Sequence, residues 1–199
     1  MTANILERLR NESAPYHDRV EANPYATAIM DGTIGLEEYK HYLERFYGFL
    51  FPLERLAESS EALSASGYDL EARRKTPMLE KDLDKLGVSA HDRGSLPLCE
   101  ELPDLSTPAK LLGCFYVIEG STMGGQMITK KLSQTLPVTP EAGLSYFNAY
   151  GGETRSRWTA FRERLLEADR SEELREEMTS SAIETFSLLE RWLGGSPRP

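Results

Sequence analysis

Apolar residues recur every three or four positions along most of this chain, which is the spacing that gathers them on one face of an α-helix. No segment alternates with period two over the length of a strand. The pattern predicts long helices over residues 4–22, 33–59, 77–86, 108–136, 155–168 and 171–193, and short ones over residues 25–30 and 141–150. It therefore predicts an all-α protein of seven to nine helices.

Capping residues and prolines refine these boundaries. Pro15 lies inside the first helix and predicts a local kink there, because proline removes one backbone donor. Thr33, followed by Glu37 and Glu38, predicts the start of the second long helix. Residues 88–103 combine glycine with several prolines and are the weakest stretch for regular structure.

The helix over residues 108–136 is interrupted by Gly120, Gly124 and Gly125. Each interior glycine costs a helix about 1 kcal/mol relative to alanine. At 100° per residue, Gly113, Gly120 and Gly124 fall on one stripe together with Ser121, so this face is nearly flat. One interpretation is close packing against another helix. The other is a helix that touches a large planar ligand with its main chain.

Length and charge narrow the classes of function. With 199 residues we expect one domain over residues 1–194 and a flexible tail over residues 195–199. The net charge of −9, without a basic block, argues against nucleic-acid binding. No apolar run approaches the roughly 18–20 residues of a membrane span, and the N-terminus lacks the apolar core of a signal peptide. We therefore expect a cytoplasmic protein without a membrane partner.

Two of the three histidines have carboxylates at helical spacing. Glu38 and His41 form a Glu-x-x-His unit like those of di-iron bundles, but such sites need a second copy, and acids in a first turn have a simpler explanation. His17 has Glu21 one turn further along, which can orient its imidazole as in a haem-ligating histidine. The alternative for His17 and Glu21 is a surface ion pair. The cysteines, Cys99 and Cys114, are too few for a disulfide framework or a zinc site.

Two stretches resemble one known family. LRNESAPYHDRVE (Leu9–Glu21) is similar to the proximal-helix motif of the heme oxygenases, and YVIEGSTMGGQMI (Tyr116–Ile128) is similar to their distal-helix motif. GSTMGGQ most resembles the bacterial, phytochrome-associated branch. The resemblance implies a multi-helix bundle that holds haem between a proximal helix and a kinked, glycine-rich distal helix.

The resemblance also implies roles for individual residues. His17 matches the axial iron ligand and Glu21 the residue that hydrogen-bonds it, while Gly120, Gly124 and Gly125 match the glycines over the distal haem face. Ser121 stands where many animal members of the family carry an aspartate that organises distal water, whereas the bacterial members vary there. It is a candidate for proton delivery together with Thr122 and ordered water.

Basic residues are expected at the haem propionates. Arg10 matches a propionate partner. Tyr116 and one of Arg155, Arg157, Arg162 and Arg164, of which we select Arg162, complete the expected set. Arg8, Lys130 and Lys131 are expected to gather with these arginines in a basic patch at the haem edge.

The implied function is oxidative cleavage of haem by O₂ to biliverdin, iron and CO, with haem as both substrate and cofactor. Because nothing in the sequence indicates a flavin or nicotinamide site, electrons are expected from a ferredoxin or flavodoxin with its reductase. Biliverdin is expected to pass to a bacteriophytochrome, as in phytochrome chromophore biosynthesis. Two alternatives remain open: a haem carrier or sensor that leaves the ligand intact, and a different enzyme on a related helical fold, such as a thiaminase-like enzyme or a quinone-cofactor oxidase.

Overall fold

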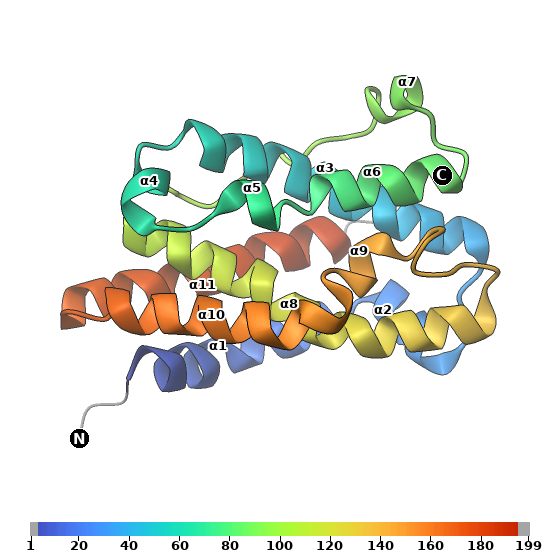
Figure 1. Ribbon diagram of the computed structural model, residues 1–199. Coiled ribbons are helices and arrows are strands. Elements are labelled where there is room, and N and C mark those ends of the chain that lie inside the picture. Colours follow the sequence, from blue (N-terminus) through green and yellow to red (C-terminus); the bar gives the residue numbers. More distant parts are fainter. Residues whose placement is uncertain (1–3, 195–199) are drawn as a thin grey trace.

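The computed structural model describes residues 4–194, and helices account for most of them (Figure 1). The elements are α1 (Ile5–Glu21), α2 (Pro24–Asp31), α3 (Leu36–Ser59), α4 (Ala62–Ser66), α5 (Leu70–Arg73), α6 (Thr76–Lys85), α7 (Ala90–Arg93), α8 (Pro108–Thr135), α9 (Ser145–Asn148), the 3₁₀ helix η1 (Gly151–Glu153), α10 (Thr154–Ala168) and α11 (Glu172–Gly194). Within residues 4–194 there is no strand, only isolated β-bridges at Thr139. The all-α prediction is confirmed.

The long helices pack around α8. In Figure 1, α8 and α10 run along the molecule with α1 below them, and α11 packs against both α8 and α1. α11 approaches α8 closely because Gly113 has no side chain: a Cβ there would lie 2.1 Å from the carbonyl oxygen of Met178. The interpretation that a glycine of α8 allows close packing against another helix is therefore confirmed for Gly113.

Local capping fixes where the site-bearing helices begin. The side chain of Asn4 accepts a hydrogen bond from the Glu7 amide, and Glu7 in turn accepts from the Asn4 amide, so α1 starts with a capping box. Thr107 caps α8 by accepting from the Lys110 amide, and Pro108 occupies the first turn. Both caps mark the start of a helix, and the helices predicted to begin at residues 4 and 108 do begin next to them.

The structure changes two of the predicted helices and adds three short ones. α1 is one helix that includes Pro15, close to the span predicted over residues 4–22. α3 begins at Leu36 because Glu38 accepts from the Gly35 amide at 2.9 Å, whereas Thr33 bonds back to α2. The helix predicted over residues 141–150 is reduced to α9, since Gly143 adopts a left-handed conformation with φ +97°. With the short α4, α5 and α7, the described residues hold eleven α-helices, more than predicted.

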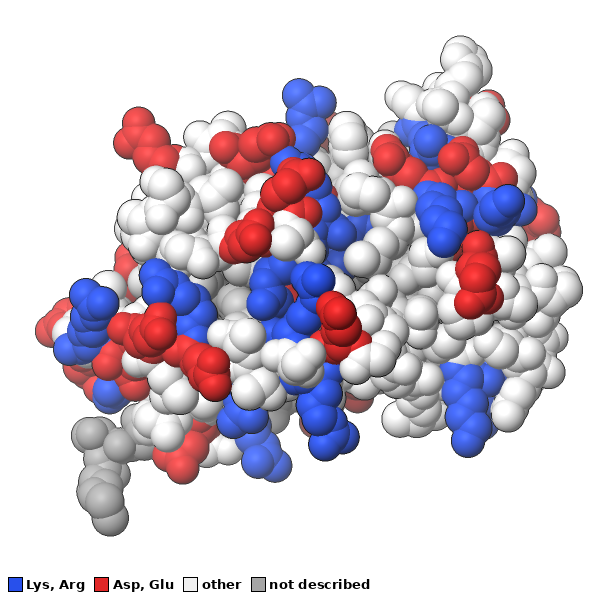
Figure 2. Space-filling view, viewed as in Figure 1, with Lys and Arg blue, Asp and Glu red and all other residues white. Residues whose placement is uncertain are grey.

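Charge is spread over the surface in small groups. Figure 2 shows acidic and basic side chains interspersed over one face of the molecule. Among residues 4–194, no helix is both long enough and apolar enough to cross a bilayer. The tail predicted over residues 195–199 lies outside the described residues.

Candidate active site

A cavity of about 480 Å³ lies between α1 and α8, within the size range of ligand pockets. α1 contributes one wall with Arg10, Ser13, Ala14, His17, Val20 and Glu21. α8 contributes the opposite wall with Tyr116, Val117, Ile118, Gly120, Ser121, Thr122, Met123, Gly124, Gly125 and Ile128. The two motifs singled out in the sequence thus face each other across one space.

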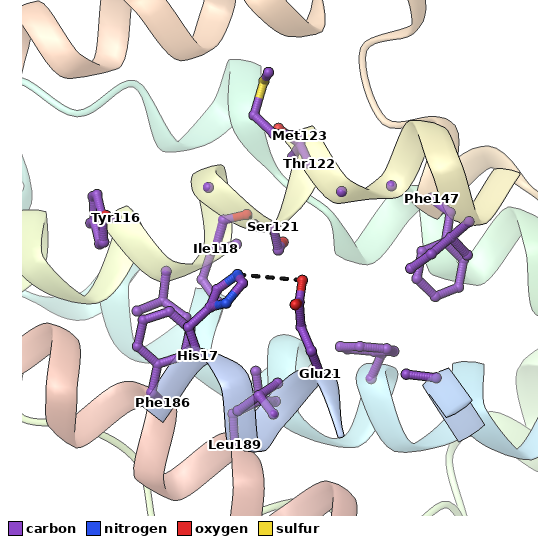
Figure 3. A pocket seen from close by; sticks show the side chains of 18 of the residues that line it. His17, Glu21, Tyr116, Ile118, Ser121, Thr122, Met123, Phe147, Phe186 and Leu189 are labelled. Atoms are coloured by element: carbon purple, nitrogen blue, oxygen red, sulfur yellow. Dashed lines mark hydrogen bonds and ion pairs between the residues drawn. The ribbon is translucent and has the colours of Figure 1, made fainter. Parts of the chain in front are cut away.

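His17 stands on the α1 wall with its side chain about half exposed. Its Nε2 lies 3.4 Å from Glu21 Oε1, the contact drawn in Figure 3, and its Nδ1 lies 3.7 Å from Asp18 Oδ1. The edge of the ring packs against Phe186 of α11, with ring centroids 5.8 Å apart. Glu21 therefore contacts the imidazole, as expected. For Nε2 to bind a metal in the cavity, however, the ring has to turn away from this carboxylate.

The glycines of α8 differ in what surrounds them. A Cβ at Gly124 would meet no atom within 4 Å, and one at Gly120 would come no closer than 3.6 Å to Trp158. At Gly125 it would lie 2.2 Å from the carbonyl oxygen of Phe147. Gly120 and Gly124 thus leave the cavity wall flat, while Gly125 allows the α9 segment to approach. Close packing is thus confirmed for Gly113 and holds for Gly125 as well, while contact of Gly120 and Gly124 with a planar ligand stays a prediction.

Two hydroxyls stand beside these glycines. Ser121 Oγ donates to the carbonyl of Ile118 at 2.8 Å, and Thr122 Oγ1 donates to the carbonyl of Glu119 at 2.7 Å. Both protons are directed into the helix, so the hydroxyls offer lone pairs to the cavity and can accept from water. Figure 3 shows Ser121 above His17 and Glu21.

One end of the cavity is basic. Arg10 and Tyr116 line it, and burial raises the pKa of the Tyr116 phenol while the nearby Ser13 hydroxyl and the charges of Arg162 and Arg10 oppose that rise. Arg162 is exposed on α10 and does not line the cavity itself, although its charge acts on Tyr116. Of the predicted site residues, Arg162 is the one that the structure places outside the wall.

The other end of the cavity is aromatic and was missed in the sequence. Tyr42, Phe46 and Phe147 line it and pack in one group, with 4.7 Å between the ring centroids of Tyr42 and Phe46, which are tilted, and 5.9 Å between those of Phe46 and Phe147, which meet edge to face. Asn23 orients Tyr42 by donating to its hydroxyl at 3.2 Å. These residues come from three separate helices or loops and carry only ordinary core periodicity in the sequence.

The predicted basic patch is smaller than expected. Arg8 pairs with Glu12, Glu172 and Glu176, so its charge is compensated between α1 and α11. Lys131 donates to the carbonyl of Met30 at 3.1 Å.

Three other cations of the predicted patch have no carboxylate partner within the described residues. Among the described residues, no ion pair involves Arg10, Arg162 or Lys130.

A flat, largely apolar space with one histidine on its wall and cations at one end suits a planar ligand that carries a metal and acidic groups. The Glu38/His41 unit offers no comparable site: Glu38 caps the Gly35 amide, and His41 Nδ1 lies 3.1 Å from Glu44. The sequence model of the family described as "Heme oxygenase" matches residues 3–194. This chain belongs to the heme oxygenase family.

Relatives of known name agree with that assignment. A heme oxygenase from Xanthomonas campestris pv. campestris is 30% identical over 173 residues, which span 86% of this chain and 98% of that relative. The heme oxygenase of Leptospira interrogans superimposes with a TM-score of 0.78 at 16% identity, covering 96% of this chain and 99% of that one. Heme oxygenase-1 of the cyanobacterium Synechocystis, in complex with heme, gives 0.75 at 14% identity, covering 96% and 91%.

The heme oxygenase resemblance of the two motifs is thereby confirmed at the level of the family and the fold. The position in the phytochrome-associated branch stays a prediction. So do the roles of the individual site residues, which rest on the geometry above.

Proposed function

We propose that this chain is a heme oxygenase that binds one haem in the cavity between α1 and α8 and cleaves it with O₂ to biliverdin, iron and CO. The observation that carries the proposal is the placement of His17 opposite Gly120 and Gly124 across one cavity, in a chain of this family. The membership supports the haem-degrading activity, and the geometry supports the site.

The residues present fit a haem group. The imidazole of His17 supplies an axial ligand, and Glu21, already in contact with it, is suited to hold the ring once Nε2 has turned toward the metal. Arg10 and Tyr116 offer a cation and a phenol to the propionates. Arg162 can join them by moving its exposed side chain. The aromatic end receives the apolar edge of the ring.

Haem supplies the iron chemistry that activates O₂ and is itself the molecule that is cleaved. The contribution of the chain is geometric. Because Gly120 and Gly124 carry no side chains, the main chain of α8 can approach the haem face and restrict where a small ligand lies on it. Ser121 and Thr122 accept hydrogen bonds from water on this side and so can hold the water through which protons arrive.

Electrons come from an external donor in this proposal, and the product passes to an acceptor outside the chain. An acidic ferredoxin or flavodoxin fits exposed cations of this chain, namely Arg10 on the cavity wall, Arg162 on α10 and Lys130 on α8. A bacteriophytochrome is the proposed receiver of biliverdin, on the similarity of GSTMGGQ to that branch.

A haem carrier or sensor on the same fold is the second candidate, favoured by Ser121 at the position where many animal members carry an aspartate. Absorption spectroscopy separates the two. We expect hemin to give a Soret band that saturates at one haem per chain, and reduction with ascorbate under air to replace that band with the spectrum of biliverdin. A carrier would saturate in the same way and return intact haem. No Soret shift at all would contradict haem binding.

A further inference from the structure

Glu119 is a buried charge at a decisive position of α8, immediately before the first cavity glycine. It is the sole acidic residue of this helix and is only 1% exposed. Its carboxylate accepts from Lys75 Nζ at 2.7 Å, from the Tyr150 hydroxyl at 2.9 Å and from the Tyr68 hydroxyl at 3.2 Å, and it also pairs with the guanidinium of Arg73. An ionised carboxylate is tolerated at such a depth only when donors surround it in this way.

The donors come from two segments of the chain, residues 68–75 and the turn at Tyr150, both distant from Glu119 in the sequence. Tyr68 precedes α5, Arg73 ends it, Lys75 precedes α6, and Tyr150 lies between α9 and η1. Glu119 therefore ties the middle of α8 to both of these segments. Tyr68 also packs face to face on Phe115, one turn earlier on α8, with ring centroids 4.2 Å apart.

All hydrogen-bond donors of the Lys75 ammonium are used within this cluster. The three protons of its ammonium go to Glu119, to the Tyr150 hydroxyl at 2.6 Å and to the carbonyl of Arg73 at 2.7 Å. Lys75 contributes to the cavity wall, yet no proton of its ammonium is left for the cavity. Lys75 therefore stabilises the Glu119 carboxylate and does not donate a proton to a ligand in the cavity.

A second attachment holds α8 six residues further along, at Gly125. The carbonyl of Phe147 reaches the backbone at Gly125, where a side chain would collide with it. α9, which carries Phe147, is held in turn by the buried carboxylate of Asp82, which accepts from the amides of Ser145 and Tyr146 at 2.8 Å each. The segment Gly120–Gly124 thus lies between two places, Glu119 and Gly125, where α8 is attached to the rest of the fold.

We propose that Glu119 is a positioning residue whose charged cluster sets how closely the Gly120–Gly124 backbone approaches the haem face. The proposal rests on the proposed function. Because the two glycines have no side chains that could adjust, the gap above the haem depends on where the helix axis lies. Loosening the cluster moves the axis and changes how tightly a small ligand is confined on the distal side.

The test compares Glu119→Gln with the wild type and with Asp169→Asn in the haem complex. Asp169 is a matched control: its side chain is 8% exposed and accepts from Arg175 Nε at 2.7 Å and from the Ile5 amide at 3.1 Å, away from the cavity. The readouts are the C–O stretching frequency and the CO dissociation rate of the ferrous haem complex, together with the hemin affinity.

We expect Glu119→Gln to shift the C–O frequency and to release CO several-fold faster, with hemin affinity near that of the wild type because His17 is untouched. Asp169→Asn should leave all three unchanged. Unaltered CO behaviour in Glu119→Gln, or an equal change in Asp169→Asn, would overturn the proposal.

Tyr150→Phe and Tyr68→Phe keep the test decisive if Glu119→Gln does not fold. Each removes one donor to the carboxylate, and each should produce a smaller shift in the same direction; no shift in either would overturn the proposal. Failure of the wild type to bind hemin is a different result, because it would contradict the proposed function itself.

Discussion

His17 occupies an exposed turn of α1 and contributes little to the core. Its main packing contact is the edge of Phe186, and its ion-pair partners, Asp18 and Glu21, are exposed as well. A half-exposed histidine between two carboxylates costs little to replace as far as stability is concerned. Because its imidazole lines the cavity, replacing His17 should weaken ligand binding without affecting folding.

His17→Ala should therefore leave the free energy of unfolding of the apoprotein within about 0.5 kcal/mol of the wild type, as surface substitutions usually do. Hemin affinity should fall on the order of 100-fold or more, because even the outer partners of a metal ligand account for about 10–100-fold. Urea unfolding and a Soret titration measure the two effects.

The matched control is His41→Ala. His41 is a partly exposed histidine that pairs with Glu44 on α3 and takes no part in the cavity wall. It should change neither quantity. If His17→Ala bound hemin with the affinity of the wild type, the assignment of the ligand would be wrong.

Alanine at the glycines of α8 distinguishes packing from ligand contact. Gly113→Ala and Gly125→Ala place a Cβ 2.1 and 2.2 Å from carbonyl oxygens, so each should destabilise the apoprotein by roughly 1–3 kcal/mol or more. Gly124→Ala meets no atom and should stabilise the helix by up to about 1 kcal/mol.

Gly124→Ala should at the same time weaken hemin binding, because its methyl group enters the space above the proposed haem face. Urea unfolding of the apoproteins and hemin titrations check the set. A Gly124→Ala variant that binds hemin normally would show that this part of α8 does not contact the ligand.

Among individual residues, those that could be predicted from the sequence lie at short, regular spacings from one another. His17 with Glu21, and the glycines within a helical pattern, are recognisable from short spacings. Glu119, Lys75 and Tyr150 could not be predicted, because a buried charged cluster assembled from distant segments has no periodicity of its own. Arg162 was selected from four nearby arginines, and the helix phase that turns it away from the wall was not evident.

At the scale of elements, the start of α8 determines the position of everything on its cavity face. Asp104 precedes the helix and accepts from the Ser106 amide at 2.8 Å and from Lys110 Nζ at 2.6 Å. The Lys110 and Ser106 hydrogen bonds lower the pKa of Asp104 to about 2. The folded state thus holds this carboxylate in its charged form more strongly than the unfolded chain does.

The sign of the pH effect follows from that shift. The stability contributed by Asp104 is present above its ordinary pKa near 3.8 and is lost as the pH falls toward about 2. Asp104→Asn should therefore be less stable than the wild type at pH 7, by less than about 1 kcal/mol since the group is exposed, and the two should converge only below about pH 2.

Urea unfolding at both pH values measures the difference, and Lys110→Met should remove the same pH-dependent part. A difference that is equal at the two pH values would mean that the ionised form of Asp104 has no special role.

Helix starts were predicted correctly at Asn4 and Thr107, where a side chain caps the helix, but not for α3, whose first amide is capped by Glu38 and not by Thr33. Helix boundaries were also wrong where tertiary contacts decide. α9 is short because Asp82 of α6 binds its first amides and Gly143 turns the chain, and neither feature can be read from residues 141–150 alone. α4, α5 and α7 span only four or five residues, too few to show a helical period.

For the molecule as a whole, the proposed function brings an acidic electron donor to a chain that is itself acidic. The net charge of −9 opposes such an encounter, so local exposed cations have to guide it. Pairing has removed Arg8 from this set, and Lys131 is engaged by Met30. Lys130 is exposed and is the informative residue to change.

Lys130→Glu should slow reduction of the haem complex by ferredoxin several-fold at low ionic strength. The difference should vanish near about 1 M salt, where the screening length is about 3 Å. Stopped-flow absorption measures the rate, and Lys85→Glu, an equally exposed change on α6, is the control. Equal slowing by the two variants would show that net charge alone, not the position of the cation, governs the encounter.

The central claim is that this chain opens haem and does not merely hold it. The most direct test is a single turnover: one equivalent of hemin is bound, ascorbate or ferredoxin with its reductase is added under air, and absorption and CO release are followed together. The account predicts loss of the Soret band, one CO per haem and a biliverdin spectrum. Recovery of intact haem, with no CO released, would contradict it.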